Sequence, residues 1–287
     1  MVPTIIKKRS CLFLLTIQLL VNCSSSDSVI DTNRETNNLV GLNTIQPGVQ
    51  VAYPKGSTKS QYGFYVYVPS EYNIANAEKY PLLIHLHGGG ARGDSAVNPN
   101  DLNSILFDGP PSLIHKNQWN PKHPMIVVSP QSPSIWNTEN LHNFITFLID
   151  NLKIDTQRIY MTGFSMGGKG CYDYISSKGS NSYVVAIVPI AGWGNVSTGN
   201  QFTNIPVWAF HGDADRIISY DKSISMVNAI NAENPTTKAK ITIYSGIDHD
   251  SWSRTYDNTG RGSANSAYDP FDISIYEWMY LYKKTDL

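Results

Sequence analysis

The chain has 287 residues, of which 41% are hydrophobic and 16% are charged, and its formal net charge at pH 7 is −1. This length suits one α/β domain, and the apolar content excludes disorder over the whole chain. Lys and Arg number 22 against 23 Asp and Glu, so no excess of basic residues indicates a nucleic acid partner.

The first residues have the organisation of an export signal. Lys7, Lys8 and Arg9 precede an apolar run at 11–21. That run is shorter than the about 20 residues a membrane-spanning helix needs, and a charged start followed by a short apolar run is typical of a signal peptide. The segment ending in Cys23 resembles a bacterial lipobox, although Asn22 stands where a small residue is usual.

These features predict three segments. We expect a signal peptide with a lipobox at 1–23, with lipidation of Cys23. Residues 24–45 are polar and predict a flexible tether, and 46–287 predict one folded domain. The protein is then either secreted or a periplasmic or outer-membrane lipoprotein, and it meets a membrane only through its N-terminal lipid.

Short apolar runs that end at Gly or Pro alternate with stretches whose apolar residues recur every three or four positions. The former predict strands and the latter helices. In chain order we expect strands at 62–68, 81–87 and 125–129, a helix at 139–152, a strand at 159–163, a helix at 166–177, strands at 183–190 and 206–210, a helix at 221–230, a strand at 239–244 and a helix at 273–282. This alternation predicts a mainly parallel sheet with helices on both faces, whose ligands bind beyond the carboxyl ends of the strands.

The segment Gly163–Gly167 matches the pattern G-x-S-x-G between a predicted strand and a predicted helix. A tight strand-to-helix turn exposes the hydroxyl of its serine, here Ser165, and side chains at Gly163 and Gly167 would clash in it. Because a serine hydroxyl is a poor nucleophile unaided, Ser165 requires a base and an orienting acid.

His211 and His249 follow Ser165 in the chain. Only His249 leaves room for a carboxylate in the order Ser, acid, His, so we predict it as the general base. Asp213 and Asp215 both lie in the loop before it, and we favour Asp215 as the acid. We predict that Asp213 is a turn residue and His211 a structural residue at a strand end.

Three further predictions concern the surroundings of this site. Asp248 and Asp250 flank His249 and are expected to be solvated. The oxyanion hole should combine the backbone N–H of Met166 with that of Gly89, or of Gly90, in a loop that should be sensitive to added side chains. No Cys/His cluster indicates a metal, and we predict that Cys171 is a buried core residue.

Five segments, 81–93, 126–131, 163–168, 206–212 and 249–252, together resemble the α/β-hydrolase superfamily. Within it, the chain is similar to the branch of esterase D, feruloyl esterases and polyhydroxybutyrate depolymerases, and to bacterial predicted peptidases and phospholipase/carboxylesterases. The resemblance implies an α/β-hydrolase fold and ester hydrolysis through an acyl-enzyme, with no cofactor. It suggests small-molecule or carbohydrate esters as substrates, with acetyl or feruloyl groups on polysaccharides or oligosaccharides.

Two alternatives stay open at this point. One is a serine peptidase-like or a general lipase or phospholipase-type hydrolase, although no long apolar segment indicates a lipase lid. The other is a non-catalytic carbohydrate-binding lipoprotein. The presence of Ser165, Asp215 and His249 argues against the latter, because binding alone places no demand on all three.

Overall fold

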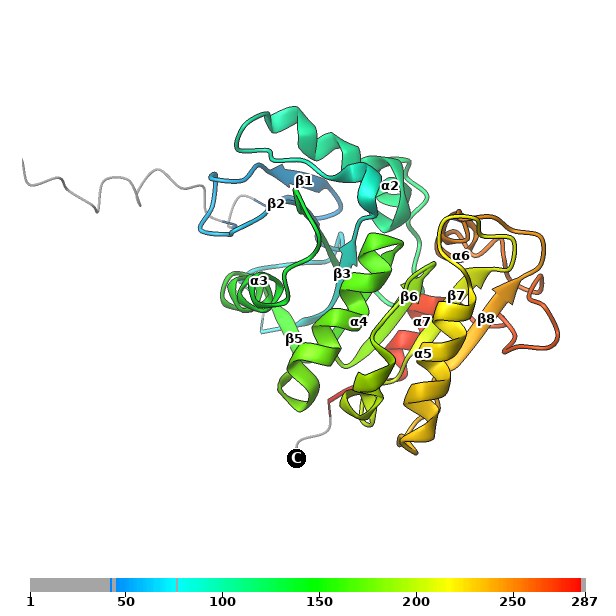
Figure 1. The fold of residues 1–287 in the computed structure, drawn as a ribbon. Coiled ribbons are helices and arrows are strands. Elements are labelled where there is room, and N and C mark those ends of the chain that lie inside the picture. Colours follow the sequence, from blue (N-terminus) through cyan, green and yellow to red (C-terminus); the bar gives the residue numbers. More distant parts are fainter. Residues whose placement is uncertain (1–41, 43–44, 76, 285–287) are drawn as a thin grey trace, which may run out of the picture. The chain divides into compact units, whose positions relative to one another are not determined.

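The computed structural model describes residues 42, 45–75 and 77–284 (Figure 1). The predicted signal peptide, Cys23 and nearly all of the predicted tether lie outside these residues. None of the helices in the described part of the chain is long and apolar enough to cross a membrane.

An eight-stranded sheet has the strand order β1-β2-β4-β3-β5-β6-β7-β8. The strands are β1 (Gln50–Tyr53), β2 (Gly63–Tyr67), β3 (Tyr80–Leu86), β4 (Ile126–Gln131), β5 (Ile154–Phe164), β6 (Ala186–Ile190), β7 (Trp208–Gly212) and β8 (Lys240–Tyr244). β1 and β2 join antiparallel at one edge, and β3 to β8 pair in parallel. The predicted mainly parallel sheet is therefore confirmed.

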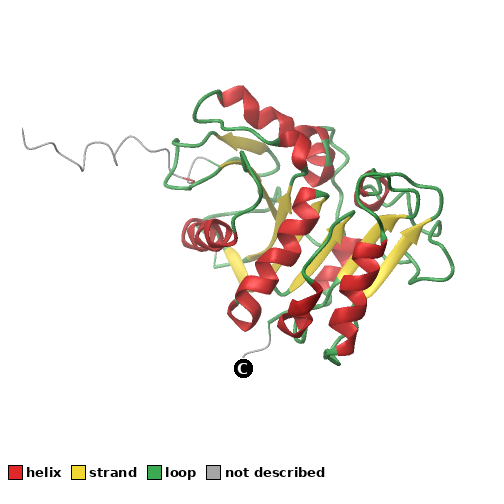
Figure 2. Cartoon of the chain, viewed as in Figure 1, coloured by secondary structure: helices red, strands yellow, loops and turns green. Residues whose placement is uncertain are grey.

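Helices cover both faces of the sheet (Figures 1 and 2). They are α2 (Gly109–His115), α3 (Thr138–Asn151), α4 (Met166–Lys178), α5 (Asp221–Ala232), α6 (Trp252–Tyr256) and α7 (Ile275–Tyr280). Alternate residues of β3 enter separate apolar clusters, with Leu82 and Ile84 in one and Leu83 in the other. The first cluster includes residues of α3, α4 and α5, and the second includes residues of α2, α6 and α7.

Several elements differ from the sequence prediction. β1 was not predicted because it is short and only partly buried at the sheet edge. α2 begins with Gly109, Pro110 and Pro111, which are typical of a turn in sequence but are tolerated in a first helical turn. β5 begins earlier, at Ile154, because Ile154 pairs with Tyr80 although polar residues follow it. The predicted helix at 273–282 is shorter, at Ile275–Tyr280.

Close contact between α4 and the ends of β3 and β6 requires glycine. A Cβ atom at Gly167 would stand 1.9 Å from the carbonyl oxygen of Leu86, and one at Gly163 would stand 2.6 Å from the carbonyl carbon of Gly167. A Cβ at Gly168 would stand 2.8 Å from the carbonyl oxygen of Ile190. The predicted clash at Gly163 and Gly167 is confirmed, and all of these contacts are with backbone atoms that cannot rotate away.

Two buried histidines lie in this region: His85 in β3, and His87 directly after it. His85 has no hydrogen-bond partner for either ring nitrogen among the described residues, and burial, with a smaller effect of His87, lowers its pKa to about 3. Burial also lowers the pKa of His87, to about 4, although its hydrogen bond to Gly88 acts in the opposite direction. Both rings are therefore neutral in the folded protein at neutral pH.

We expect Gly167→Ala to lower the free energy of unfolding by about 1–3 kcal/mol or more, because the added methyl group overlaps rigid backbone. Urea denaturation followed by circular dichroism measures this change. Gly90→Ala is the matched control, since a Cβ there meets nothing within 4 Å. Equal denaturation midpoints for the two variants would contradict the close helix–sheet contact.

We expect the free energy of unfolding to fall as the pH is lowered from 7 through about 6.5 toward 5. Histidines of the unfolded chain bind protons below about pH 6.5, whereas His85 and His87 stay neutral when folded, so protons favour the unfolded state. Urea titrations at several pH values measure the slope, and His85→Leu should reduce it. An unchanged slope in that variant would show that His85 takes up its proton without unfolding.

Candidate active site

Ser165 occupies the turn between β5 and α4, as the sequence predicts. Its backbone has a φ of 52°, a left-handed value that is strained for a residue with a side chain. Its N–H donates to the carbonyl of Ile190 at 2.9 Å, and its own carbonyl accepts from the N–H of Lys169 at 3.0 Å. The end of β6 and the first turn of α4 therefore hold the turn in this conformation.

Ser165, His249 and Asp215 form one chain of hydrogen bonds. The Nε2 atom of His249 lies 2.9 Å from the Oγ of Ser165, and its Nδ1 lies 2.7 Å from Oδ2 of Asp215. An ionised Asp215 only accepts hydrogen bonds, so Nδ1 carries the proton and Nε2 is left to accept from the serine hydroxyl. The three residues come from the loops that follow β5, β7 and β8, at the carboxyl end of the parallel strands.

The carboxylate of Asp215 is fully buried and has backbone donors as well. Its Oδ1 accepts from the N–H groups of Ile217 and Ile218 at 2.8 and 2.9 Å. Burial by itself raises the pKa of Asp215, but the hydrogen bonds from His249, Ile218 and Ile217 outweigh it and bring the pKa below its ordinary value. The side chain is therefore an anion at neutral pH, which suits it to orient an imidazole.

Asp213, the alternative acid, lies elsewhere. Its Oδ1 accepts from the N–H of Gly246 at 2.6 Å and thereby closes the loop after β8. This contact matches the predicted role of Asp213 as a turn residue. Of the two candidate acids, Asp215 is the one that contacts His249.

His211 has a contact that the sequence analysis missed. Its Nε2 lies 3.0 Å from Oδ2 of Asp215 and 2.9 Å from the carbonyl oxygen of Ile218, and its Nδ1 lies 2.8 Å from the hydroxyl of Ser223. Because Nε2 faces two acceptors, it carries the proton of the neutral ring. Burial lowers the pKa of His211 despite its contacts with Ile218 and Asp215. Two histidines therefore donate to one oxygen of Asp215. The spacing of His211 and Asp215 did not indicate this contact, because His211 lies in a strand and Asp215 in the loop that follows.

An aromatic wall stands beside His249. The indole of Trp252 is perpendicular to the imidazole, with ring centroids 5.2 Å apart, and it stacks on Phe164 at 4.4 Å. Its Nε1 donates to Oδ1 of Asp108 at 3.0 Å. The wall limits how far the ring of His249 can turn.

Asp248 is partly exposed, as predicted, and it is also paired with Arg216. Asp248 accepts from the Nε and backbone N–H of Arg216, at 2.7 and 3.1 Å, and the Arg216 guanidinium lowers the pKa of Asp248 to about 2. This pair ties the loop of Asp215 to the loop of His249. Asp250 is exposed and accepts from the backbone and hydroxyl of Ser253 at 3.0 and 2.9 Å, at the start of α6.

The predicted oxyanion loop follows β3 and is held by His87. His87 Nδ1 donates to the carbonyl of Gly88 at 2.7 Å, and its Nε2 accepts from the N–H of Ser132 at 3.0 Å. In a trans peptide the N–H of Gly89 points opposite to the Gly88 carbonyl, and therefore away from this ring. Met166 is the first residue of α4, where N–H groups have no acceptor within the helix.

The expected sensitivity of this loop to side chains holds at only one position. A Cβ at Gly88 would stand 2.5 Å from the ring of Phe164, whereas one at Gly89 or Gly90 meets nothing within 4 Å. Cys171 is buried, as predicted, and burial raises its pKa. In the described part of the chain, no group of three or more His, Cys, Asp or Glu side chains could hold a metal ion.

Comparisons with known proteins bear on the family and the fold of the chain. Residues 134–269 match the model of the dienelactone hydrolase family. Over 235 residues the chain is 25% identical to a bifunctional acetylxylan esterase/xylanase of Neocallimastix patriciarum, an alignment that covers 73% of this chain and 32% of that protein. The chain thus spans about a third of the length of this curated relative.

Solved structures show the same fold. A thermostable esterase is 27% identical with a TM-score of 0.60, over 82% of this chain and 63% of that one. A feruloyl esterase module of Clostridium thermocellum, complexed with sinapinate, is 19% identical with a TM-score of 0.52, over 74% and 84% of the two chains. The predicted resemblance is confirmed: the chain is an α/β-hydrolase, similar to the dienelactone hydrolase family and to esterases of this fold.

Proposed function

We propose that the protein is a serine carboxylesterase in which Ser165 is the nucleophile, His249 the general base and Asp215 the orienting acid. The observation that carries this proposal is the hydrogen-bonded chain Ser165–His249–Asp215, with distances of 2.9 and 2.7 Å. Triads are recognised by such geometry and roles. The similarity to the dienelactone hydrolase family and to a thermostable esterase supports it.

The reaction proceeds in two halves. His249 Nε2 takes the hydroxyl proton of Ser165 while Oγ bonds to the ester carbonyl carbon, which gives a tetrahedral intermediate. The carbon–alkoxy bond then breaks, the leaving alcohol receives the proton from His249, and the acyl group stays on Ser165. In the second half, His249 takes a proton from a water molecule while the water oxygen bonds to the acyl carbon. The bond from that carbon to Oγ of Ser165 then breaks, Oγ receives the proton from His249, and the carboxylic acid leaves.

The negative oxygen of the intermediate requires donors that are already in place. We propose the backbone N–H groups of Met166 and Gly89 for this role, with Gly90 as the alternative to Gly89. The direction of the Gly88–Gly89 peptide, set by His87, supports Gly89.

For the substrate we propose acetyl or feruloyl esters of polysaccharides or oligosaccharides. The acetylxylan esterase/xylanase relative supports the acetyl group, and the feruloyl esterase module has only the fold in common with this chain.

Export and lipidation at Cys23 stay predictions of the sequence. A mass measurement of the mature N-terminus tests the lipidation, and an unmodified Cys23 would contradict the predicted lipid anchor.

We expect Ser165→Ala to abolish labelling by a fluorophosphonate probe and to reduce kcat on p-nitrophenyl acetate by about 10⁴-fold or more, because the attacking oxygen is gone. Thermal melting should be unchanged within a few degrees. Parallel assays on methyl ferulate, acetylated xylan and a peptide substrate identify the substrate class. Cleavage of peptides without cleavage of esters would support the peptidase alternative and reject the esterase.

We expect His211 to act as a positioning residue for Asp215. Loss of its N–H in His211→Leu removes one hydrogen bond from Oδ2 of Asp215, the oxygen that orients His249. We expect kcat to fall about tenfold, as is usual for the loss of a hydrogen bond to a charged group, with KM little changed. His211→Gln keeps a donor and should restore most of kcat. Equal kcat values in the two variants would leave His211 only a packing role.

A further inference from the structure

A cavity of about 620 Å³ lies apart from Ser165, His249 and Asp215, none of which lines it. We call it the α6 pocket, because Tyr256, the last residue of α6, forms part of its wall. The other walls come from α2 and the chain after it, from the loop after α6 and from the start of α7. Its volume falls within the range of about 300–1,000 Å³ that is usual for small-molecule sites.

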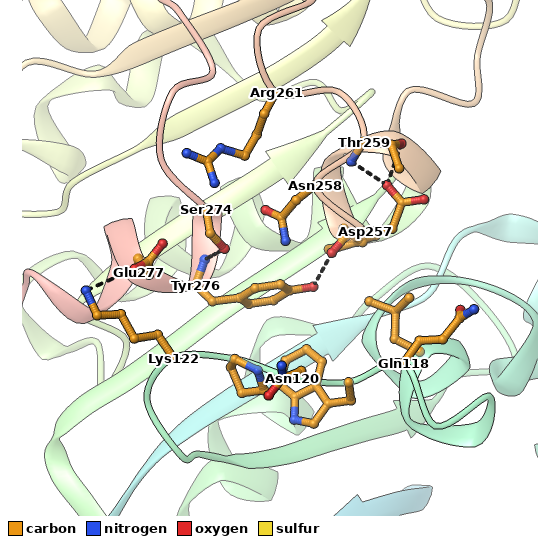
Figure 3. A pocket seen from close by; sticks show the side chains of 14 residues that line it. Gln118, Asn120, Lys122, Asp257, Asn258, Thr259, Arg261, Ser274, Tyr276 and Glu277 are labelled. Atoms are coloured by element: carbon orange, nitrogen blue, oxygen red, sulfur yellow. Dashed lines mark hydrogen bonds and ion pairs between the residues drawn. The ribbon is translucent and has the colours of Figure 1, made fainter.

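The lining offers a combination of flat aromatic and polar side chains. Figure 3 shows Arg261 and Asn258 extending from one side, Gln118, Asn120 and Lys122 from the other, and Tyr276 between them. Tyr276 packs edge-to-face against Trp119, with ring centroids 4.8 Å apart. Aromatic rings provide apolar surface for the C–H faces of a ligand, and amides provide both donors and acceptors for its hydroxyl groups.

Two buried polar atoms in this lining lack partners. The Nε1 of Trp119 and the Oδ1 of Asn258 have no hydrogen-bond partner among the described residues. A buried donor or acceptor without a partner costs about 1–3 kcal/mol, so such atoms in a native structure require an explanation. One atom is a donor and the other an acceptor, and both are closed off from solvent, so a ligand hydroxyl group pairs with either atom only when its side chain turns toward the cavity.

The charged side chains of the pocket balance in number. Two cations, Lys122 and Arg261, and two anions, Asp257 and Glu277, line it. Lys122 and Glu277 form an ion pair at 3.3 Å, and Arg261 also donates to the carbonyl oxygen of Asp272. The formal charge of the lining is therefore zero, which favours a neutral ligand over an ionic one.

We propose that the α6 pocket binds neutral sugar units of a xylan-type polysaccharide. The choice of glycan rests on the proposed esterase function, whereas the neutral, hydroxyl-rich chemistry follows from the pocket itself. His249 and Tyr256 are seven residues apart along the chain, so their Cα atoms are no more than about 25 Å apart. A single oligosaccharide can span this distance, so that sugars in the pocket hold the esterified chain near Ser165.

Binding is tested directly in the Ser165→Ala protein, which cannot turn over. We expect xylotetraose to bind in isothermal titration calorimetry, and to bind about 3–10-fold more weakly after Trp119→Phe or Asn258→Gly, each of which removes one hydrogen bond. Asn258→Gly preserves the left-handed backbone, whose φ is 64°. Asn234→Gly, at an exposed residue with a φ of 53° outside the pocket, is the matched control and should bind like the parent protein.

Steady-state kinetics supply a second measurement, made in proteins that keep Ser165. The ratio of kcat/KM on acetylated xylan to kcat/KM on p-nitrophenyl acetate should fall about 3–10-fold in the two pocket variants, and should stay constant in Asn234→Gly. Absence of xylotetraose binding, or equal binding in parent and pocket variants, would mean that the pocket holds only water and would overturn the proposal. The calorimetry requires no catalysis, so failure of the esterase function appears separately, as lost fluorophosphonate labelling of Ser165.

Discussion

The site depends on how closely α4 approaches the end of β3. A Cβ at Gly167 would stand 1.9 Å from the Leu86 carbonyl oxygen, so only glycine permits this approach. The same contact requires the sharp turn at Ser165, whose φ of 52° directs the chain from strand to helix in one residue. It also determines the spacing of the proposed oxyanion donors, because Met166 precedes Gly167 and Gly89 follows shortly after Leu86. Strain at one residue is thus offset by extensive packing on both sides of the sheet.

Beyond this turn, the electrostatics of the site centre on one buried carboxylate. Asp215 receives hydrogen bonds from two backbone N–H groups and from the rings of His249 and His211. A buried anion is tolerated only when its lone pairs are satisfied in this way. The donors keep the group ionised and also restrict its rotation, and the pair of Asp248 with Arg216 ties together the two loops that bring Asp215 and His249 into contact. Position and charge are therefore provided by the same contacts.

The short helix α6 connects the two proposed sites. At its start, Trp252 stands against the ring of His249, and at its end Tyr256 lines the α6 pocket. Tyr256 also receives a hydrogen bond on its carbonyl from Tyr276 at 3.0 Å, which anchors the helix to α7. The pocket and the ring that packs against His249 thus lie at the two ends of one short helix.

Sequence alone determined much of this protein. The alternation of short apolar runs with stretches of helical spacing predicted the parallel sheet with helices on both faces. Buried strands need continuous apolar residues, and helices packed on a sheet need an apolar residue every three or four positions, so both leave a pattern in the sequence. The order of Ser165, Asp215 and His249 selected three residues that the structure brings into contact, because each follows the carboxyl end of a strand. Tertiary structure alone decided the rest. β1 is an edge strand held by pairing with β2, and His211 acquires its contact with Asp215 only when the loop after β7 folds back. The α6 pocket is lined by segments that lie far apart in the chain. No local sequence pattern predicts that these segments come together, because their contact depends on how the helices pack over the sheet.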